Sequence, residues 1–583
     1  MHMVRPLRRS NALLLLTSLA LATGTLATVA PAHADIPGPF TTAWSAALSG
    51  KVGQSAPVVA YVGASHTPAV FVGDLRGHLH GFQVSGAAVA GWADLGTTAT
   101  SIDAALSSDG VGHLFTPRTA LSGRSVLASY AIANPATVVG AHPCVSSSCR
   151  TLSGMTYTGA TVYTGGFSQR VYGITAANLS DTWNYLNSDT TNSTPAAANL
   201  AGHGTEVVMT NDQTGNSQVV PAAQPGGHLR IFTPGRGLPI CDANIGGAPN
   251  PPGSFNSSPA IASFVAGYGP AIVFGTGLSG TMSNQLVAYN SACQRLWVSP
   301  VLAGKTIAAP AIAHTQGVSA PPTVIEEVSN AIGEPVVYEV DGRTGAVLRS
   351  HTIACTNFAQ GSAASVVAAD VNSDGAQDII ASSGGCGIAV LNGRDLSTIA
   401  SLGNGCAVQN TPVITQDSSH TLGITMAGYN ATGGCLKHFT VNVSSYSADW
   451  PEFHHDPQLT GALTQTFPSH DSLRTGQRLP VNSSLVSANG QYRALMEGNG
   501  VFAVFRQSDG AMVWHTTAGV AQAYLVVGAT QLALLATDGS TKWHTTPRAE
   551  SRPLTLVLGP TGRLTLLVHS GNQWDNDAAL WAS

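Results

Sequence analysis

Charged residues are scarce in this sequence: Asp, Glu, Lys and Arg make up 9% of the 583 residues, with a formal net charge of -5. The 25 basic residues form no stripe, which excludes a surface that binds nucleic acid through its phosphates. After the N-terminal segment no apolar run reaches the roughly 20 residues of a membrane span, so we expect no membrane insertion. The sequence also has no Cys-x-x-Cys pair and no Gly-x-Ser-x-Gly run, so a zinc site and a hydrolase elbow lack support.

Turn-forming residues are abundant instead, with 64 Gly and 32 Pro. This composition favours short strands joined by many turns over long helices. The length predicts more than one domain, each with enough residues to bury a core.

The N-terminus has the pattern of a secretory signal peptide. Three arginines precede an apolar stretch over residues 12–22, and Ala32-His33-Ala34 provides the small residues of a cleavage site. We expect residues 1–34 to be removed and the mature protein to be secreted. An uncleaved anchor is the alternative.

All eight cysteines lie between Cys144 and Cys435. An even number of cysteines in an exported chain predicts disulfides, although eight cysteines allow 105 connectivities. Proximity along the chain suggests the pairs Cys144–Cys149, Cys241–Cys293, Cys355–Cys386 and Cys406–Cys435.

Near the C-terminus one pattern occurs three times, at 494–505, 524–535 and 556–567. Each copy has an apolar run, a turn containing Gly and a second run with alternating polarity. This pattern predicts a short β-hairpin. Three hairpins that cannot bury their own apolar faces would pack around a pseudo-threefold axis, which predicts a β-prism. Each copy is followed by a tryptophan that can fill the centre: Trp514, Trp543 and Trp581.

This region resembles the bulb-type (monocot mannose-binding) lectins, beginning with the run LRTGQRL at 473–479. The resemblance implies a sugar site formed by a Gln-x-Asp-x-Asn-x-Val-x-Tyr run, whose polar groups hydrogen-bond the hydroxyls of mannose. The first copy keeps polar residues at the first two positions, Glu497 and Asn499, and has Phe505 in place of the Tyr. In the second copy only Gln531 is polar. We therefore expect carbohydrate binding mainly at the first copy; a retained scaffold without a sugar site is the alternative.

Between Asp35 and about Tyr446 a longer unit repeats. A strand that often opens with a small residue and Pro is followed by two strands around a Gly turn and by a fourth, often near a Trp. Four strands in roughly 50 residues are typical of a propeller blade. The unit resembles the quinoprotein-like (PQQ-repeat) and FG-GAP/VCBS propellers. The predicted fold is therefore all-β, an eight-bladed β-propeller followed by a β-prism, with blades opening near residues 55, 101, 155, 193, 258, 309, 362 and 411.

One hairpin of the seventh unit has the sequence DVNSDGAQD at 370–378. Oxygen-bearing side chains at positions 1, 3, 5 and 9, a Gly at position 6 and a carbonyl at position 7 suit a hard cation, so we expect Ca2+ there. The run resembles the calcium loops of FG-GAP blades, and an Asp/Asn turn satisfied by its own backbone is the alternative. The proposed ligands are Asp370, Asn372, Asp374, Ala376 and Asp378.

No catalytic residue is assigned. Quinoprotein dehydrogenases hold their cofactor with two adjacent cysteines, and no two cysteines are adjacent here, so we expect no PQQ. His454, His455 and Asp456 could be a base and its orienting group. However, consecutive side chains of an extended segment point to opposite faces, which favours a structural closing segment.

The predicted organisation is a signal peptide (1–34), a propeller (35–446), a linker (447–468) and a lectin-like domain (469–583). The favoured function is a secreted protein that binds glycans or cell-wall polysaccharide without catalysis. A single degenerate site would bind weakly, and repeated glycans or self-association would raise its avidity. One alternative is a propeller enzyme, quinoprotein-like or polysaccharide-active, which the lectin module targets. Another is a structural or adhesive surface protein.

Overall fold

The computed structural model describes residues 40–582, apart from several gaps. The predicted signal peptide, Cys144 and Cys149 lie outside the described residues. Over the described residues the chain forms strands and one short 3-10 helix, η1 (Gly384–Cys386), and no α-helix. The gaps are 64–66, 97–99, 111, 121–124, 136, 144–152, 167–169, 188–190, 201–204, 211–226, 234–236, 246–256, 265–268, 278–282, 319, 356–363, 464–471, 476–477, 480–483, 488–491, 498, 507–510, 518–522, 537–538, 548–553, 560 and 569–577.

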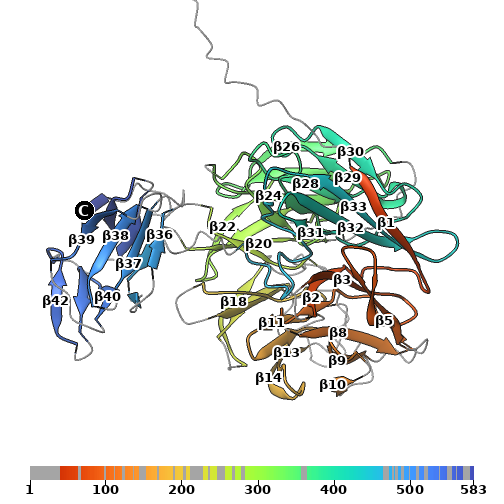
Figure 1. The fold of residues 1–583 in the computed structure, drawn as a ribbon, viewed down its shortest axis with the longest axis horizontal. Coiled ribbons are helices and arrows are strands. Elements are labelled where there is room, and N and C mark those ends of the chain that lie inside the picture. The colour runs from red at the N-terminus through yellow and green to blue at the C-terminus, as the bar shows by residue number, and fades with distance from the viewer. Residues whose placement is uncertain are drawn as a thin grey trace, which may run out of the picture.

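Eight antiparallel sheets formed by the described residues are the blades of a β-propeller (Figure 1). The predicted blade openings lie just before the innermost strands, so the predicted eight-bladed propeller is confirmed. Blades 1 to 4 consist of β2 (Val58–Val62), β3 (Thr67–Gly73), β4 (His78–Gln83) and β5 (Ala88–Gly96); β6 (Thr100–Ser101), β7 (Ser107–Ser108), β8 (His113–Ala120), β9 (Ser125–Ala131) and β10 (Val138–Pro143); β11 (Thr156–Thr158), β12 (Thr161–Thr164), β13 (Arg170–Thr175) and β14 (Asp181–Leu186); and β15 (Ala196–Ala198), β16 (Glu206–Thr210), β17 (His228–Phe232) and β18 (Pro239–Asn244).

The remaining blades follow the same order. Blades 5 to 8 consist of β19 (Ala260–Ala262), β20 (Ala271–Gly275), β21 (Leu286–Tyr289) and β22 (Arg295–Val298); β23 (Ala311–Ala313), β24 (Thr323–Ser329), β25 (Pro335–Asp341) and β26 (Val347–Thr352); β27 (Val367–Ala369), β28 (Asp378–Ser382), β29 (Ile388–Leu391) and β30 (Thr398–Leu402); and β31 (Val413–Ser418), β32 (Thr421–Tyr429) and β33 (Gly434–Asn442) with β1 (Thr41–Leu48).

The position of a strand in its blade explains its residues. Innermost strands such as β15, β19 and β23 are short, rich in Ala and fully buried, because eight of them converge on one axis. The outermost strands β18 and β26 alternate between half-buried and exposed residues, since only one of their faces packs on a neighbouring blade.

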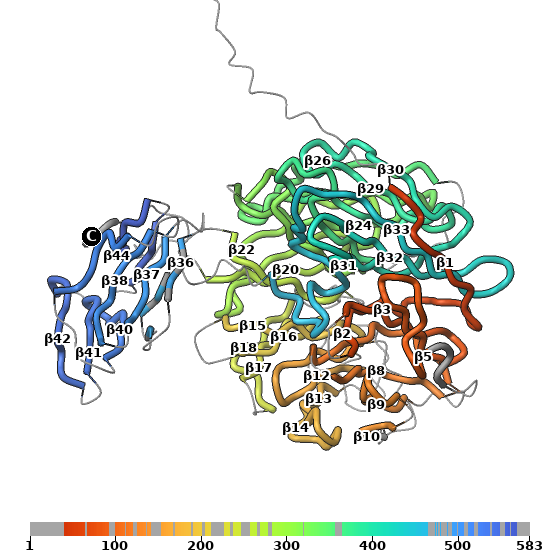
Figure 2. Tube along the Cα trace, viewed as in Figure 1, coloured from red at the N-terminus to blue at the C-terminus, as the bar shows by residue number. Residues whose placement is uncertain are grey.

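The N-terminal strand β1 closes the ring. It pairs antiparallel with β33, from Thr41 opposite Thr440 to Leu48 opposite Gly434, and so becomes the outermost strand of blade 8 (Figure 2). Both ends of the propeller chain therefore belong to one sheet, and main-chain hydrogen bonds hold the ring shut. The repeat pattern of the sequence does not predict this strand.

The described residues contain three disulfides, two of which connect neighbouring blades. Cys241–Cys293 joins blade 4 to the β21–β22 turn of blade 5, and Cys355–Cys386 joins blades 6 and 7. Cys406–Cys435 ties the start of blade 8 to β33. Three of the four predicted pairs are thus confirmed.

The first part of the predicted linker, residues 447–463, lies in the propeller. It is hydrogen-bonded to all eight blades and therefore winds around the axis. The contacts in blades 1 to 8 are Val59 N to Glu452 Oε2, Ser108 N to Pro457 O, Tyr157 N to Gln458 O, Ala197 N to Thr460 O, Ile261 N to Gly461 O, His314 N to Asp449 Oδ2, Ala368 N to Trp450 O and Ile414 N to Pro451 O.

Within this axial segment the expected orientation of side chains is wrong. His454 and His455 have φ of 58° and 80°, so the chain turns instead of running extended. As a result His455 Nδ1 and Asp456 Oδ2 are 3.0 Å apart, on the same side. Both ring nitrogens of buried His454 lie 2.8 Å from the carbonyl oxygens of Leu459 and Pro259. Burial lowers the pKa of His454 to about 4, and these carbonyl groups oppose that shift.

The C-terminal region forms a β-prism of three four-stranded sheets within the described residues. Their apolar faces share one core, which includes Met496, Phe502, Leu534 and Leu556. The rings of Trp514 and Trp543 meet edge to face at 6.0 Å and are half-buried against this core, while the side chain of Trp581 is not described. The sheets are β34 (Ser472–Arg474), β43 (Leu554–Leu558), β44 (Leu564–Val568) and β45 (Ala578–Ala582); β35 (Arg478–Leu479), β40 (Tyr524–Val527), β41 (Leu532–Leu535) and β42 (Thr541–His544); and β36 (Ser484–Val486), β37 (Tyr492–Met496), β38 (Phe502–Arg506) and β39 (Met512–His515).

Candidate functional site

The turn between β37 and β38 brings two of the predicted sugar-binding residues together. Glu497 N donates to Val501 O at 2.8 Å, and Gly500, with φ 84°, donates to Glu497 O at 2.9 Å. Asn499 Oδ1 accepts Val501 N, which leaves Nδ2 of this exposed amide 3.4 Å from Glu497 Oε2. A carboxylate and an amide N–H therefore lie side by side at the surface of the prism.

Phe505 lies further along the same strand. Phe502 and Val504 face the core, so Val501, Ala503 and Phe505 lie on the outer face of the sheet, where Ala503 is buried and the other two are half-buried. Phe505 is half-buried and stands opposite Arg493 of β37. The structure thus places Phe505 on the outer face of β38, while Glu497 and Asn499 belong to the turn at its start.

Gln531 is arranged differently. The β40–β41 turn spans residues 528–531 and is one residue shorter than the turn over 497–501, with Gly528 N bonded to Gln531 O. The side-chain oxygen of Gln531 is buried and has no hydrogen-bond partner among the described residues. Gln531 therefore occupies the position of Val501, and its acceptor does not reach solvent as the Asn499 amide does.

The third turn has the same length as the first but a different surface. Gly559 N donates to Arg563 O, and Gly562 N donates to Gly559 O. The ring of Tyr492 covers Gly562 so closely that an added Cβ would lie 2.4 Å from it. Of the three turns, the one over 497–501 alone presents a carboxylate beside an amide.

The predicted calcium loop is built mainly from side chain to backbone hydrogen bonds. Asp370 accepts the N–H groups of Asp374 and Gly375, and Asp378 accepts those of Val371 and Gly393. Burial raises the pKa of Asp378 to about 7, and the nearby Asp374 and Asp370 carboxylates raise it as well. Burial and the Asp374 charge also raise the pKa of Asp370.

One cation touches this loop. Arg394 Nε lies 3.0 Å from Asp374 Oδ2, and its Nη2 donates to the Asp374 carbonyl oxygen. Among the described residues no group of three or more His, Cys, Asp and Glu side chains is arranged as metal ligands. The oxygen atoms of the loop are of the type that binds Ca2+. Their arrangement is not that of a metal site, because the carboxylates are turned toward backbone N–H groups.

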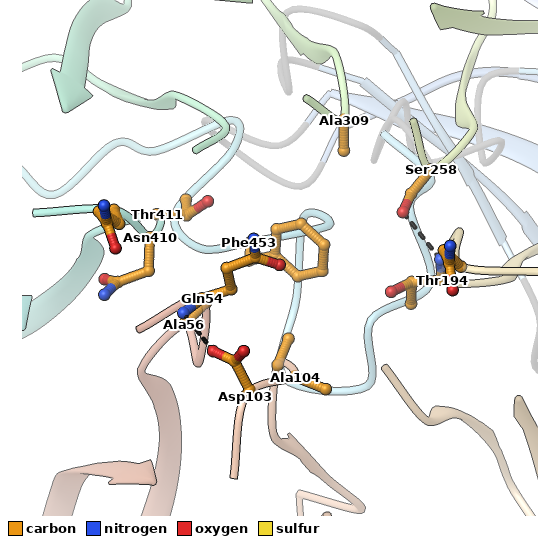
Figure 3. Close-up of a pocket in the computed structure, with 13 residues that line it drawn as sticks. Gln54, Ala56, Asp103, Ala104, Thr194, Ser258, Ala309, Asn410, Thr411 and Phe453 are labelled. Carbon is orange, nitrogen blue, oxygen red and sulfur yellow. Dashed lines mark hydrogen bonds between the residues drawn. The ribbon is translucent and has the colours of Figure 1, made fainter. Parts of the chain in front are cut away.

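A third feature was not predicted: a well on the propeller axis with a volume of about 50 Å³ (Figure 3). It is lined by residues that precede the innermost strands, and by Phe453 of the axial segment. Thr194, Ser258 and Thr411 line it with buried hydroxyls, whereas Ala56, Ala105 and Ala309 are apolar. The sequence signal was the small residue, often followed by Pro, that opens several of the blades, and it indicated strands only.

Hydrogen bonds between blades hold these hydroxyls in place. Gly154 N donates to Thr194 Oγ1 at 2.9 Å, and Thr194 N donates to Ser258 Oγ at 2.8 Å. Similarly, Ala309 N donates to Ser365 Oγ and Ser365 N to Thr411 Oγ1, each at 3.0 Å. Each of these oxygen atoms therefore accepts an N–H from the preceding blade.

Comparisons with known proteins support the fold. No known protein family and no curated protein sequence matches the chain. The quinohemoprotein alcohol dehydrogenase of Comamonas testosteroni has a TM-score of 0.52 and 9% identity, covering 70% of this chain and 77% of that chain. At this identity the likeness shows the propeller fold alone.

Two further likenesses are too weak to carry an argument. BamB of Moraxella catarrhalis has a TM-score of 0.44 and 12% identity, covering 69% of this chain and 99% of that chain. The Polygonatum cyrtonema lectin in complex with monomannoside has a TM-score of 0.16 and 20% identity, covering 18% of this chain and 94% of that chain.

The axial well does not suit the quinone cofactor PQQ. The carboxylates of PQQ need cationic partners, and Arg is the side chain that most often binds a carboxylate in this way in proteins. Among the residues that line the well, Asp103 is the charged one, and its charge is negative. The described disulfides join cysteines at least 29 residues apart, so none of them is the adjacent pair of that family.

Proposed function

We propose that this protein is a secreted, non-catalytic carbohydrate-binding protein, whose sugar site is the β37–β38 turn with the outer face of β38. One observation carries the proposal: Glu497 and Asn499 meet at the surface of the turn with hydrogen-bonding groups directed away from the core. Neighbouring hydroxyls of a sugar can donate to the Glu497 carboxylate and accept from Asn499 Nδ2. Phe505 offers an apolar face where the bulb-type lectins have a Tyr.

Such a site binds weakly by itself. Each net hydrogen bond contributes about 1 kcal/mol, so two or three of them with one aromatic contact give a Kd of roughly millimolar. Glycans that repeat the same sugar, or association of several copies of the protein, would raise the avidity. Cell-wall or surface polysaccharide is therefore a better ligand class than a free monosaccharide.

An extracellular or periplasmic location is consistent with the three disulfides, since such bonds persist in oxidising compartments. Among the described residues no helix has the length and hydrophobicity to cross a membrane.

We also propose that the loop over 370–378 takes Ca2+. The support is its set of oxygen donors, which are the Asp370, Asp374 and Asp378 carboxylates, the Asn372 amide and the Ala376 carbonyl. A bound cation would neutralise clustered carboxylates, which Arg394 balances at Asp374 alone. The role of Ca2+ would be structural, because the loop joins β27 to β28 and contacts the axial segment where Asp370 N donates to Ser447 O.

The sugar site is tested on the full mature chain. A glycan array identifies ligands, and titration calorimetry with a mannan oligosaccharide compares the native protein with Glu497→Ala/Asn499→Ala. We expect the double substitution to abolish binding by the prism, and Gln531→Ala to leave it nearly unchanged, because the Gln531 oxygen is buried. Native affinity in the double variant would place the site elsewhere.

A further inference from the structure

We infer that the axial well of the propeller is a second carbohydrate site, which takes the acetamido arm of an N-acetylated sugar. The inference shares with the proposed function only the idea that the ligand is a glycan, since it concerns another domain and other residues. The juxtaposition that carries it is a set of buried hydroxyls around an aromatic ring in one cavity, with Thr194 and Ser258 on one side of Phe453 and Thr411 on the other (Figure 3).

The hydroxyl groups that line the well can each still donate one hydrogen bond. Thr194, Ser258 and Thr411 are each 2% exposed, and each oxygen already accepts a backbone N–H. Within the described part of the chain none of these hydroxyls donates a hydrogen bond. Since a hydroxyl carries one hydrogen besides its lone pairs, three O–H groups remain to donate into the well. A carbonyl oxygen is the kind of group that satisfies them.

Another part of the lining is apolar, although Asn192 and Asn410 also line the well with buried side-chain oxygens that have no hydrogen-bond partner among the described residues. Phe453 packs against Ala56, Ala105 and Leu459, and the ring of His454 stacks on it at 5.6 Å. These contacts fix the ring, whose remaining surface is half-buried and lines the well. A methyl group placed there would leave water and contact Phe453 and the alanines, so the well offers places for both ends of an acetyl group.

The size of the well and the charge of its lining restrict further which ligands fit. A cavity needs about 10–15 Å³ for each water-sized group, so a volume of about 50 Å³ holds roughly four such groups. The acetamido arm has that many non-hydrogen atoms. Asp103 in the wall disfavours a carboxylate, which would otherwise also accept from the hydroxyls. At the rim, exposed Gln54 and half-buried Gln409 can bond hydroxyls of the sugar ring outside the well.

The test is saturation-transfer NMR on the full mature chain with two matched probes, methyl N-acetylglucosaminide and methyl glucoside. We expect the acetyl methyl group to receive the strongest saturation, and the acetylated probe to bind at least about fivefold more tightly, which equals one net hydrogen bond. The same result is expected in Glu497→Ala/Asn499→Ala, because the well lies in the propeller.

Two substitutions address the well itself. Ala309→Leu fills it and keeps every hydroxyl, so it should abolish the preference for the acetylated probe; Ala331→Leu in the exposed β24–β25 turn is its control. Thr411→Val removes one donor and should weaken binding about fivefold. Its control is Thr306→Val, which likewise removes a buried acceptor of a backbone N–H but lies outside the lining.

Three results obtained with the probes and the well variants would overturn the inference, and a fourth comes from the prism variant. The first three are equal affinity for the two probes, no saturation of either probe at about 50 mM, and a preference that survives Ala309→Leu. If the preference instead disappears in Glu497→Ala/Asn499→Ala, the acetylated sugar binds to the prism, which supports the proposed function and contradicts the role of the well.

Discussion

Glu326 and Glu327 are consecutive residues of β24, both are buried, and only Glu327 has a hydrogen-bond partner among the described residues. Glu327 Oε2 accepts the N–H of Ser382 from blade 7 at 3.1 Å, whereas both Glu326 oxygens are without a partner there. Burial raises the pKa of both carboxyls well above its usual range, and the Glu327 charge adds to the shift at Glu326. Successive side chains of a strand point to opposite faces, so Glu326 lies on the face of β24 opposite to the one from which Glu327 contacts blade 7.

We predict that Glu326→Gln stabilises the propeller as pH rises. A carboxyl whose pKa is higher in the folded state contributes stability below its unfolded pKa, near 4.5, and loses it as pH rises toward the folded pKa. The amide does not titrate, so the gain in Tm should be small at about pH 4.5 and reach about 2 °C or more at pH 8. Calorimetry at both pH values, with Glu334→Gln of the same blade as control, measures it; a gain that is equal at both pH values contradicts the ionisation argument.

Calcium should stabilise the seventh blade through the loop over 370–378. Adding chelator should lower the Tm of the native chain, and Asp374→Ala should be insensitive to chelator. The matched control is Asp341→Ala, because Asp341 at the end of β25 also accepts backbone N–H groups of a turn and pairs with an Arg. Chelator sensitivity in Asp374→Ala equal to that of the native chain, or none in the native chain, contradicts the site.

Loss of the closing strand should open the propeller. Removing residues 35–48 leaves the outer edge of β33 unpaired and exposes the apolar residues of blade 8 that β1 covers, such as Leu436. We expect broad thermal unfolding and rapid proteolysis in blade 8. Thr42→Pro, which removes one donor of the same strand, serves as a milder variant, and a sharp native-like transition after the deletion would show that β1 is dispensable.

Breaking one disulfide between blades should cost part of the stability. Cys355→Ser/Cys386→Ser removes a link that closes a loop with a sequence separation of 31 residues, which predicts a loss of up to about 4 kcal/mol. Urea unfolding of the oxidised native chain and the double variant gives the difference. Equal midpoints would mean that blade packing alone holds blades 6 and 7 together.

Most of the fold could be predicted from local sequence patterns. Blade openings such as Thr194-Pro195 and Ser258-Pro259 predicted strands because each blade is a local unit with its own turns and apolar runs. The three C-terminal hairpins were equally visible, since their turns and alternating runs lie within a dozen residues of one another. Pairs such as Cys355–Cys386 were found for the same reason, as neighbouring blades are neighbours in the chain.

What the sequence by itself determined, then, is the kind and number of repeating units, and the candidate turn around Glu497 and Asn499. Only the tertiary structure decided the features that join distant residues: the pairing of β1 with β33, the winding of 447–463 around the axis, and the well between Thr194, Thr411 and Phe453. These contacts depend on how eight blades close into a ring, which brings residues hundreds of positions apart to one axis. The tertiary structure also decided that His455 turns toward Asp456, because a turn with φ above zero redirects side chains that an extended segment would place on opposite faces. It likewise decided that the Gln531 oxygen is buried, because the turn that holds Gln531 is shortened by one residue.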